Sequence, residues 1–370
     1  MKKTALTALA VLFALLLLAV LLFTGIYFTR LQSAASIQQI THYSDGYNLY
    51  CMNVRYNYSL DDIIGYGITD DQSMVDAILR EALPLLPVSI QAPSFGCTAF
   101  TVTDNTGTVH MGRNYDFRND TSAMVVYCAP KGGYRSVAFA ALDNIGANAP
   151  LESMKARFAA LTAPFICLDG LNEKGVSIAV LTLDSDPTYQ QTGKPVIAPT
   201  LAIRLVLDRA ATTAEAVELL RGYDMFASGG RDYHFYITDS TGDGRVVEYD
   251  CDDPARPLVD TPAAAATNFY ALYADRVKPD RRNGIYGHGK ERYDTVLRVL
   301  AEQKNTLSDM TVWDALRAAA QKPDPEDITS NTQWSISFNN TDLTAEVALR
   351  RHWEQVFRFR LTADTVTQEQ

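Results

Sequence analysis

The chain begins with one long apolar segment and continues as short amphipathic segments. After Lys2 and Lys3, residues 4–29 carry no charged side chain and include the apolar run 11–23. About 20 apolar residues span the hydrocarbon core of a bilayer as a helix, whereas the apolar part of a secretory signal has about 7 to 15. Residues 1–29 are therefore expected to form a transmembrane helix that keeps the lysines in the cytoplasm and exports the rest of the chain.

A second interpretation of the N-terminus stays open. Ser33, Ala34 and Ala35 are small residues of the kind that precede a signal-peptide cleavage site. A retained helix would place an extracytoplasmic catalytic domain on the cell membrane, whereas a cleaved one would yield a secreted protein. In both cases residues 30–45, which are mostly polar, are expected to be a linker.

Two further segments follow, residues 46–96 and residues 97–370. The best helix of the first begins near Thr69, where Thr69 and Gln72 have the spacing of a capping box. The second consists of short runs of β-type residues, interrupted by pairs of helices and typical of an α+β fold in which helices cover sheets. Its predicted strands are 98–103, 108–113, 124–128, 136–142, 165–168, 176–183, 233–238, 245–249, 333–338, 344–349 and 356–361, and its predicted helices are 200–210, 213–221, 291–302 and 311–322.

Composition argues against two classes of partner. The net charge is -10, and no run of Lys and Arg interleaved with aromatic residues suggests a nucleic-acid surface. The five histidines are scattered and no CxxC pair occurs, so neither a metal site nor a cofactor is expected.

Five cysteines form an odd set, and an unpaired thiol in an exported protein suggests a catalytic role. We expect Cys128 and Cys167, which lie in apolar runs, to be small core residues.

Cys97 is the best candidate nucleophile. A thiol needs a base or a local field that lowers its pKa, yet no histidine lies in a recognisable catalytic context. If the bond between Gly96 and Cys97 were cut, the new α-amino group of Cys97 could accept the thiol proton. Glycine at 96 would tolerate the strained backbone that such a cut requires. Arg113 and Asp116 would then support thiolate and ammonium, although a surface ion pair is the plainer interpretation of these two residues.

The run from Cys97 through Gly112-Arg113-Asn114-Tyr115-Asp116 resembles the choloylglycine hydrolase and penicillin V acylase family of linear amide carbon-nitrogen hydrolases. In that family a mature N-terminal Cys is followed by Arg at +16 and Asp at +19, the offsets of Arg113 and Asp116. Further similarity appears at residues 169–175, at Thr267-Asn268 and at Arg292, so that it covers residues 97 to 361.

The resemblance implies a four-layer αββα N-terminal-nucleophile fold. It also implies roles: Cys97 as nucleophile with its α-amine as base, Asn268 as oxyanion donor, and Arg292 as the residue that completes the polar cluster. The family's second oxyanion residue, usually Asn or Tyr, aligns with Thr182, where only a backbone N–H could serve. That departure argues against a simple bile-salt or penicillin preference.

The long leader is a second departure. Many bile-salt hydrolases expose the Cys by losing the initiator Met, whereas 96 residues precede Cys97 here. This arrangement resembles acid ceramidase and the penicillin-forming acyltransferases, whose precursors cut themselves into a small α and a large β chain. We therefore expect residues 46–96 to remain bound as an α subunit of a self-derived heterodimer; the alternative is an inert leader that is removed.

The expected activity is hydrolysis of a small-molecule N-acyl amide through a thioester acyl-enzyme. The same site would act as an acyltransferase if an amine replaced water. A papain-like peptidase that pairs Cys97 with His234 or His288 is one rival, and an anchored binding protein without catalytic activity is another.

Overall fold

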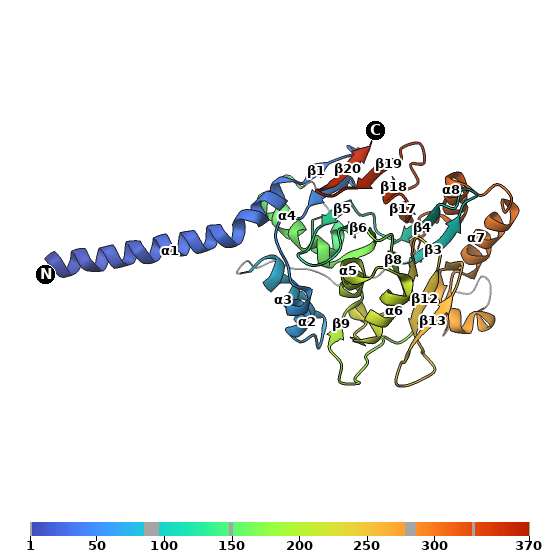
Figure 1. Ribbon diagram of the computed structural model, residues 1–370, viewed down its shortest axis with the longest axis horizontal. Coiled ribbons are helices and arrows are strands. Elements are labelled where there is room, and N and C mark those ends of the chain that lie inside the picture. The colour runs from blue at the N-terminus through green and yellow to red at the C-terminus, as the bar shows by residue number, and fades with distance from the viewer. Residues whose placement is uncertain (1, 85–95, 148–150, 278–285, 328–329, 370) are drawn as a thin grey trace.

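The computed structural model describes residues 2–84, 96–147, 151–277, 286–327 and 330–369. Helix α1 (Lys2–Ala35) projects from a body of sheets and helices (Figure 1). Within the described residues, one helical segment, Leu9–Ala35, is long and apolar enough to cross a membrane, by length and composition alone. The large apolar side chains that the structure describes between Leu9 and Phe23 are exposed. This outcome agrees with the apolar N-terminal helix expected from the sequence.

The larger of the two main sheets, sheet A, has nine strands among the described residues, in the order β1-β2-β5-β6-β7-β8-β11-β12-β13. Neighbouring strands are antiparallel, except that β2 and β5 run parallel. The strands of sheet A are β1 (Gln38–Gln39), β2 (Leu49–Asn53), β5 (Ala123–Cys128), β6 (Ser136–Ala141), β7 (Cys167–Asn172), β8 (Ser177–Leu183), β11 (Asp232–Thr238), β12 (Arg245–Tyr249) and β13 (Leu258–Pro262).

Sheet B has seven strands in the described part of the chain, in the order β14-β3-β4-β17-β18-β19-β20. It faces sheet A, as the edge-to-face contact of Phe139 with Phe338 shows, with ring centroids 5.9 Å apart. The buried apolar faces of the two sheets form the core. The strands of sheet B are β14 (Ala265–Ala266), β3 (Gly96–Thr103), β4 (Val109–Asp116), β17 (Thr332–Asn339), β18 (Thr344–Leu349), β19 (Phe357–Leu361) and β20 (Val366–Glu369).

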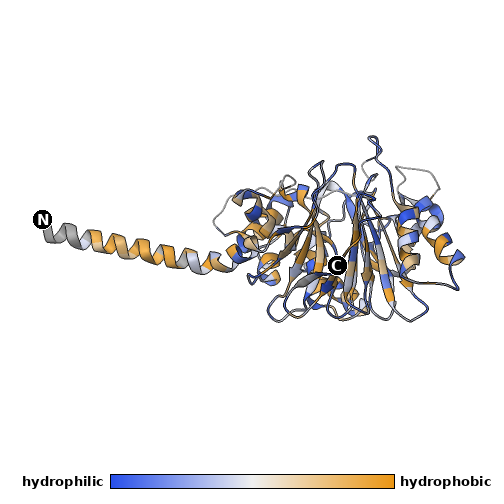
Figure 2. Ribbon diagram, turned by 90° about the horizontal axis from the view of Figure 1, so that it is seen from above, coloured by the Kyte–Doolittle hydropathy of each residue, from blue (hydrophilic) through white to orange (hydrophobic). Residues whose placement is uncertain are grey.

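Helices cover the outer faces of both sheets (Figure 2). Helices α5 (Pro199–Arg209) and α6 (Thr213–Arg221) lie on sheet A, and α7 (Lys290–Glu302) and α8 (Asp309–Ala319) lie on sheet B. Phe100 of β3 packs with apolar residues of α7 and α8 in a second, smaller core. The mixed helix-and-sheet fold predicted from the sequence is therefore confirmed.

Shorter elements connect these layers. Strand β9 (Val196–Ile197) pairs with β10 (Asp224–Met225), and β15 (Asn268–Phe269) pairs with β16 (Gly287–His288). The remaining helices are α2 (Leu60–Gly65), α3 (Asp71–Ala82), α4 (Met154–Ala159) and the short 3-10 turns η1 (Leu142–Ile145), η2 (Ala160–Phe165), η3 (Ser228–Gly230) and η4 (Ala271–Arg276).

Most predicted elements of residues 97–370 occur within a few residues of their expected bounds, and two local details differ. The cap of α3 is Asp70, whose side chain accepts from the N–H of Ser73, so the capping box lies one residue after the predicted Thr69 and Gln72. Strand β7 starts at Cys167, because the preceding residues form the 3-10 turn η2 instead of a strand. Both shifts are local and leave the order of the elements unchanged.

The leader is part of the folded body. Strand β2 pairs in register with β5, from Leu49 opposite Ala123 onward, and Leu49 and Met52 are fully buried. The sequence interpretation missed this strand. Residues 85–95, which directly precede the expected cleavage site, lie outside the described residues.

Residues 30–45 differ from the linker expected from their polar composition. Helix α1 continues through them to Ala35, and Ser33 and Ala34 are buried. Arg30 donates from Nε to the carbonyl oxygen of Ala82 at 2.7 Å, at the end of α3. Polar side chains in this segment bind backbone carbonyl groups of the body. Polar composition alone therefore does not distinguish a docked segment from a free linker.

Truncation of Leu49 tests whether the leader contributes to stability. We expect Leu49→Ala to lower the free energy of unfolding by about 2 to 5 kcal/mol, because the substitution leaves a cavity between β2 and the core. Leu272→Ala is the matched control, since Leu272 is 38% exposed and its truncation should cost less than about 0.5 kcal/mol. Denaturant unfolding of both variants measures the difference. Equal free energies of unfolding would show that β2 contributes little to stability.

Candidate active site

Cys97 lies at the start of β3, directly after Gly96, and is fully buried. It pairs with Tyr115 of β4, while Gly96 pairs with Asp116. Side chains on a strand alternate between the two faces of a sheet, and cross-strand partners share a face. Arg113 therefore lies on the face of the Cys97 thiol, and Asp116 lies on the opposite face, towards α7 and α8. A spacing of three residues in β4 thus places one charged group on each side of residue 97.

Asn268 and Arg292 hold the main chain of Cys97. The Cys97 N–H donates to Oδ1 of Asn268 at 3.0 Å, and Nη1 of Arg292 donates to the Cys97 carbonyl oxygen at 2.6 Å. Nη2 of Arg292 also donates to Oδ1 of Asn268 at 2.7 Å. The close approach needs Gly289, because a Cβ there would lie 2.4 Å from Nη2 of Arg292. Its positive φ of 85° is also one that glycine adopts readily.

Arg113 is a fully buried cation with a buried counter-charge. Its Nε donates to Oδ2 of Asp169 at 3.2 Å, and its Nη2 donates to the Val180 carbonyl oxygen at 3.0 Å. Nε1 of Trp334 donates to the same Asp169 oxygen at 3.2 Å. Burial raises the pKa of Asp169 to about 6, although Arg113 and Trp334 favour its charged form.

Near neutral pH the Cys97 thiol is almost entirely protonated in the intact chain. Burial raises its pKa to about 12, and the nearby Arg113 guanidinium only partly offsets that effect. Asp116 acts against the thiolate as a like charge. A thiol in this state is a weak nucleophile near neutral pH, because the thiolate is the reactive form.

Asp116 is anchored by side chains that the sequence interpretation did not identify. Oγ1 of Thr332 donates to Oδ1 of Asp116 at 2.6 Å, and Nε2 of Gln321 donates to Oδ2 at 2.9 Å. Nη1 of Arg292 lies 3.5 Å from Oδ2. Burial raises the pKa of Asp116, with Arg292 opposing that shift. The carboxylate therefore faces the polar cluster around the Cys97 main chain.

The main-chain carbonyl group of Thr182 contacts the side chain of Asn268. Nδ2 of Asn268 donates to the Thr182 carbonyl oxygen at 2.8 Å, and Thr182 is buried in β8 opposite Tyr233. The expectation had been a donor at Thr182, whereas the contact seen here uses its carbonyl group as an acceptor. An amide NH₂ group carries two protons, so Nδ2 of Asn268 retains the capacity for a second hydrogen bond.

The residues to which the sequence analysis gave roles in catalysis therefore lie together around Cys97. Cys97, Arg113, Asp116, Asn268 and Arg292 are connected by hydrogen bonds, strand pairing or close charges, and Thr182 joins them through Asn268. The sequence interpretation assigned no role to Asp169, although it is the first residue of the quoted 169–175 motif. Trp334, Thr332 and Gln321 carry no motif, and only their contacts reveal them.

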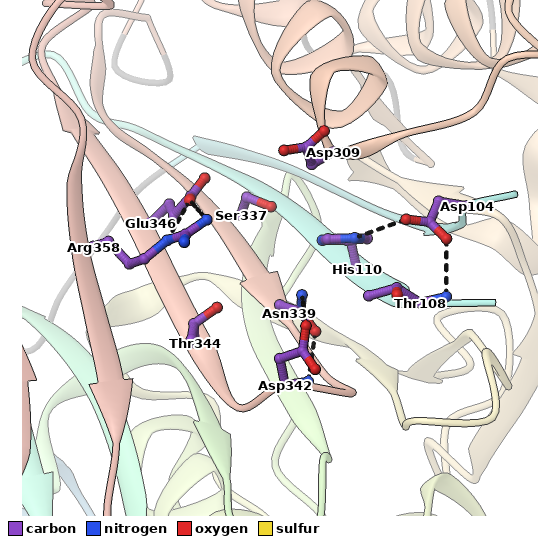
Figure 3. Close-up of a pocket in the computed structure, with 10 residues that line it drawn as sticks. All are labelled: Asp104, Thr108, His110, Asp309, Ser337, Asn339, Asp342, Thr344, Glu346 and Arg358. Atoms are coloured by element: carbon purple, nitrogen blue, oxygen red, sulfur yellow. Dashed lines mark hydrogen bonds and ion pairs between the residues drawn. The ribbon is translucent and has the colours of Figure 1, made fainter. Parts of the chain in front are cut away.

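No metal centre is found in the described part of the chain, where no group of three or more His, Cys, Asp or Glu side chains is arranged to hold an ion. A polar hollow of about 210 Å³ lies at the other end of β4 from Asp116 (Figure 3). It contains the buried His110, whose Nε2 lies 3.7 Å from Asp104. None of the residues named from the sequence for catalysis lines this hollow.

Comparison with known protein sequences gives a family match over part of the chain. Residues 97–253 match the model of the linear amide C-N hydrolases, choloylglycine hydrolase family. No curated protein sequence matches the chain.

Two solved structures share the fold. The conjugated bile acid hydrolase from Clostridium perfringens, in one variant, has a TM-score of 0.53 and 14% identity over 74% of this chain and 96% of that chain. The penicillin V acylase from Agrobacterium tumefaciens has a TM-score of 0.51 and 17% identity over 72% of this chain and 87% of that chain. Residues 97–253 thus match the choloylglycine hydrolase family, whose enzymes hydrolyse C–N bonds other than peptide bonds in linear amides, and the fold is shared with solved structures of a bile acid hydrolase and a penicillin V acylase.

Proposed function

We propose that the chain is an autoprocessed cysteine N-terminal-nucleophile hydrolase with a four-layer αββα domain at residues 97–370. It cleaves linear amides of N-acyl compounds through a thioester acyl-enzyme. One observation carries this proposal: the main-chain nitrogen of Cys97 is itself bound at the centre of the polar cluster, 3.0 Å from Oδ1 of Asn268. Scission of the Gly96–Cys97 bond converts that nitrogen into an α-amine already in place.

The α-amine supplies the base that the uncut chain lacks. In the precursor the thiol has a pKa of about 12, and the nitrogen of Cys97 is still part of the peptide bond to Gly96. A free α-amino group has a pKa near 8, so it can accept the thiol proton close to neutral pH. Arg113 stabilises the resulting thiolate, and Asp116 favours the ammonium form on the other face of the strand.

The reaction proceeds in two halves. The thiolate attacks the amide carbonyl, and the tetrahedral oxyanion accepts from the second Nδ2 proton of Asn268 and from a main-chain N–H near Thr182. The α-ammonium then protonates the departing amine, leaving a thioester on Cys97. Water hydrolyses the thioester and releases the acid, whereas a competing amine in place of water would make the enzyme an acyltransferase.

The leader is proposed to remain bound as an α subunit. Its strand β2 completes sheet A, and its helix α3 packs against η2 of the body. Helix α1 is proposed to be a retained membrane anchor that holds the catalytic domain outside the cytoplasm. Buried Ser33 and Ala34 favour retention, because a signal peptidase would have to cut beside residues packed into the body.

A papain-like peptidase remains the main rival, with His234 or His288 as base. In the described structure the contacts of both histidines are with groups other than the Cys97 thiol. Nε2 of His234 contacts the Thr267 carbonyl oxygen, and Nδ1 of His288 contacts Asp184. A non-catalytic binding protein is the other rival. Neither rival requires a free N-terminus at residue 97, so maturation separates them from the proposal.

The new N-terminus is the first test. We expect N-terminal sequencing of the purified protein to find a large chain that begins at Cys97, and Cys97→Ala to remain a single chain without amidase activity. Cys251→Ala is the control, since Cys251 is a half-buried thiol outside the polar cluster and should mature as the wild type does. A fully active wild-type preparation in which residues 96 and 97 are still joined would refute the mechanism.

The oxyanion assignment makes a second prediction. Thr182→Val keeps the main-chain N–H and the shape of the side chain, so kcat should stay within about threefold of the wild type. Asn268→Leu removes a side-chain donor and should lower kcat by about 10² to 10³-fold. Steady-state kinetics on a chromogenic N-acyl amide, with the Cys97 N-terminus verified by mass spectrometry, measures both. Loss of activity in Thr182→Val would instead assign the hydroxyl group a role.

The counter-charge of Arg113 makes a third prediction, on stability. Asp169 has a folded-state pKa of about 6, above its ordinary value near 4, so the native state binds this proton first as the pH falls. The stabilisation that the native state gains by protonation of Asp169 is complete below about pH 4 and is lost as the pH rises through about 6. The difference in Tm between the wild type and Asp169→Asn should therefore shift in favour of the wild type between pH 7 and pH 4.5. A constant difference would show that Asp169 stays charged throughout.

A further inference from the structure

His234 and Glu248 form a buried pair behind the proposed oxyanion residue. His234 lies on β11 and Glu248 on β12, and both side chains are fully buried. Nε2 of His234 lies 2.7 Å from the carbonyl oxygen of Thr267, the residue before Asn268. Nδ1 of His234 lies 3.4 Å from Oε2 of Glu248. The imidazole ring therefore connects a carboxylate to the main chain next to Asn268.

Both ring nitrogens of His234 face oxygen atoms that accept hydrogen bonds. Nε2 must carry a proton to bind a carbonyl oxygen. Glu248 lies against the other ring nitrogen, so the ring is held in one orientation between the carboxyl group and the Thr267 carbonyl oxygen. Glu248 is fixed in turn, because it accepts from the N–H groups of Ala271 at 2.9 Å and Leu272 at 2.6 Å.

This pair fixes the segment that carries Asn268 from both ends. Through His234 it holds the Thr267 carbonyl group, and directly it holds the start of η4 three residues after Asn268. The side-chain amide of Asn268 makes every contact described above with Cys97, Arg292 and Thr182. A displacement of about 1 Å in a catalytic group can cost about 10²-fold in rate, so the placement of this backbone matters for the reaction.

We propose that His234, with Glu248, is a positioning residue for Asn268, and that it acts through the main chain of Thr267 without contacting the thiol. The inference rests on the proposed function, in which Asn268 stabilises the oxyanion. It also gives one of the two histidines of the papain-like rival a role that needs no proton transfer to or from Cys97.

Two near-isosteric substitutions test the proposal. The amide nitrogen of Gln at position 234 reaches about as far as Nε2 and can still donate to Thr267, whereas the shorter Asn reaches only to the position of Nδ1. We expect His234→Gln to keep kcat within about threefold and His234→Asn to lower kcat by about 10 to 10²-fold with little change in KM, because the affected contact strengthens in the transition state. His352→Asn, at an exposed histidine, should be unchanged.

Each outcome separates the alternatives. Equal kcat in the Gln and Asn variants would overturn the positioning role. Loss of activity in both variants, in folded chains that begin at Cys97, would also overturn it and would identify His234 as the base of a papain-like site. Absence of the Cys97 N-terminus in the active wild type would refute the proposed function itself, so the two failures are distinguishable.

Glu248→Gln provides a second measurement if His234→Asn does not fold. In the wild-type background it should lower kcat severalfold, because the contact that orients the His234 ring is altered. In the His234→Gln background it should have little effect, since that ring is no longer present. Additive losses in the double variant would contradict a coupled pair.

Discussion

The whole site depends on the binding of the Cys97 main chain in a fully buried position. Its N–H group and its carbonyl group are engaged by Asn268 and Arg292, and this leaves the thiol on the other face of the strand beside Arg113. A buried backbone nitrogen in a sheet would ordinarily pair with a neighbouring strand. Here side chains replace that partner, so the nitrogen can become a free amine without rearrangement of the neighbouring sheet.

Burial of this site requires compensation of every charge. Arg113 is matched by Asp169, and Arg292 by Asp116, and each pair has further hydrogen bonds from Trp334 or from Thr332 and Gln321. A buried ion pair contributes little net stability but strongly resists loss of one member. The pairs therefore fix the geometry around Cys97 more than they stabilise the fold. His234 and Glu248 form a further buried contact, on β11 and β12.

The leader and the chain from Cys97 onward share one core. Strand β2 and the last turns of α1 contribute buried side chains and hydrogen bonds to the body, so the proposed cut at Gly96 divides the chain without dividing the fold. On this view the membrane anchor and the nucleophile would end up on different polypeptides held by non-covalent contacts. In that proposal these contacts would keep the chain that begins at Cys97 attached to the leader after the cut.

The sequence by itself determined the features that depend on short-range order. The hairpin of β3 and β4 follows from alternating residues around a turn, and its register places Arg113 and Asp116 on opposite faces beside residue 97. The apolar length of α1 and the pairs of outer helices likewise follow from local pattern. Asn268 and Arg292 were indicated only by family resemblance, because no local rule connects them to a cysteine 171 and 195 residues earlier.

Only the tertiary structure decided the partners that lie far apart along the chain. The pairing of β2 with β5, the counter-charge Asp169, the supports of Asp116 and the contact of His234 with Thr267 all arise where sheets and helices pack together. The docked end of α1 shows the same limit, since polar residues that suggested a free linker bind backbone carbonyl groups of the body. Periodicity reports which face of an element is buried, but not which distant residue meets it there.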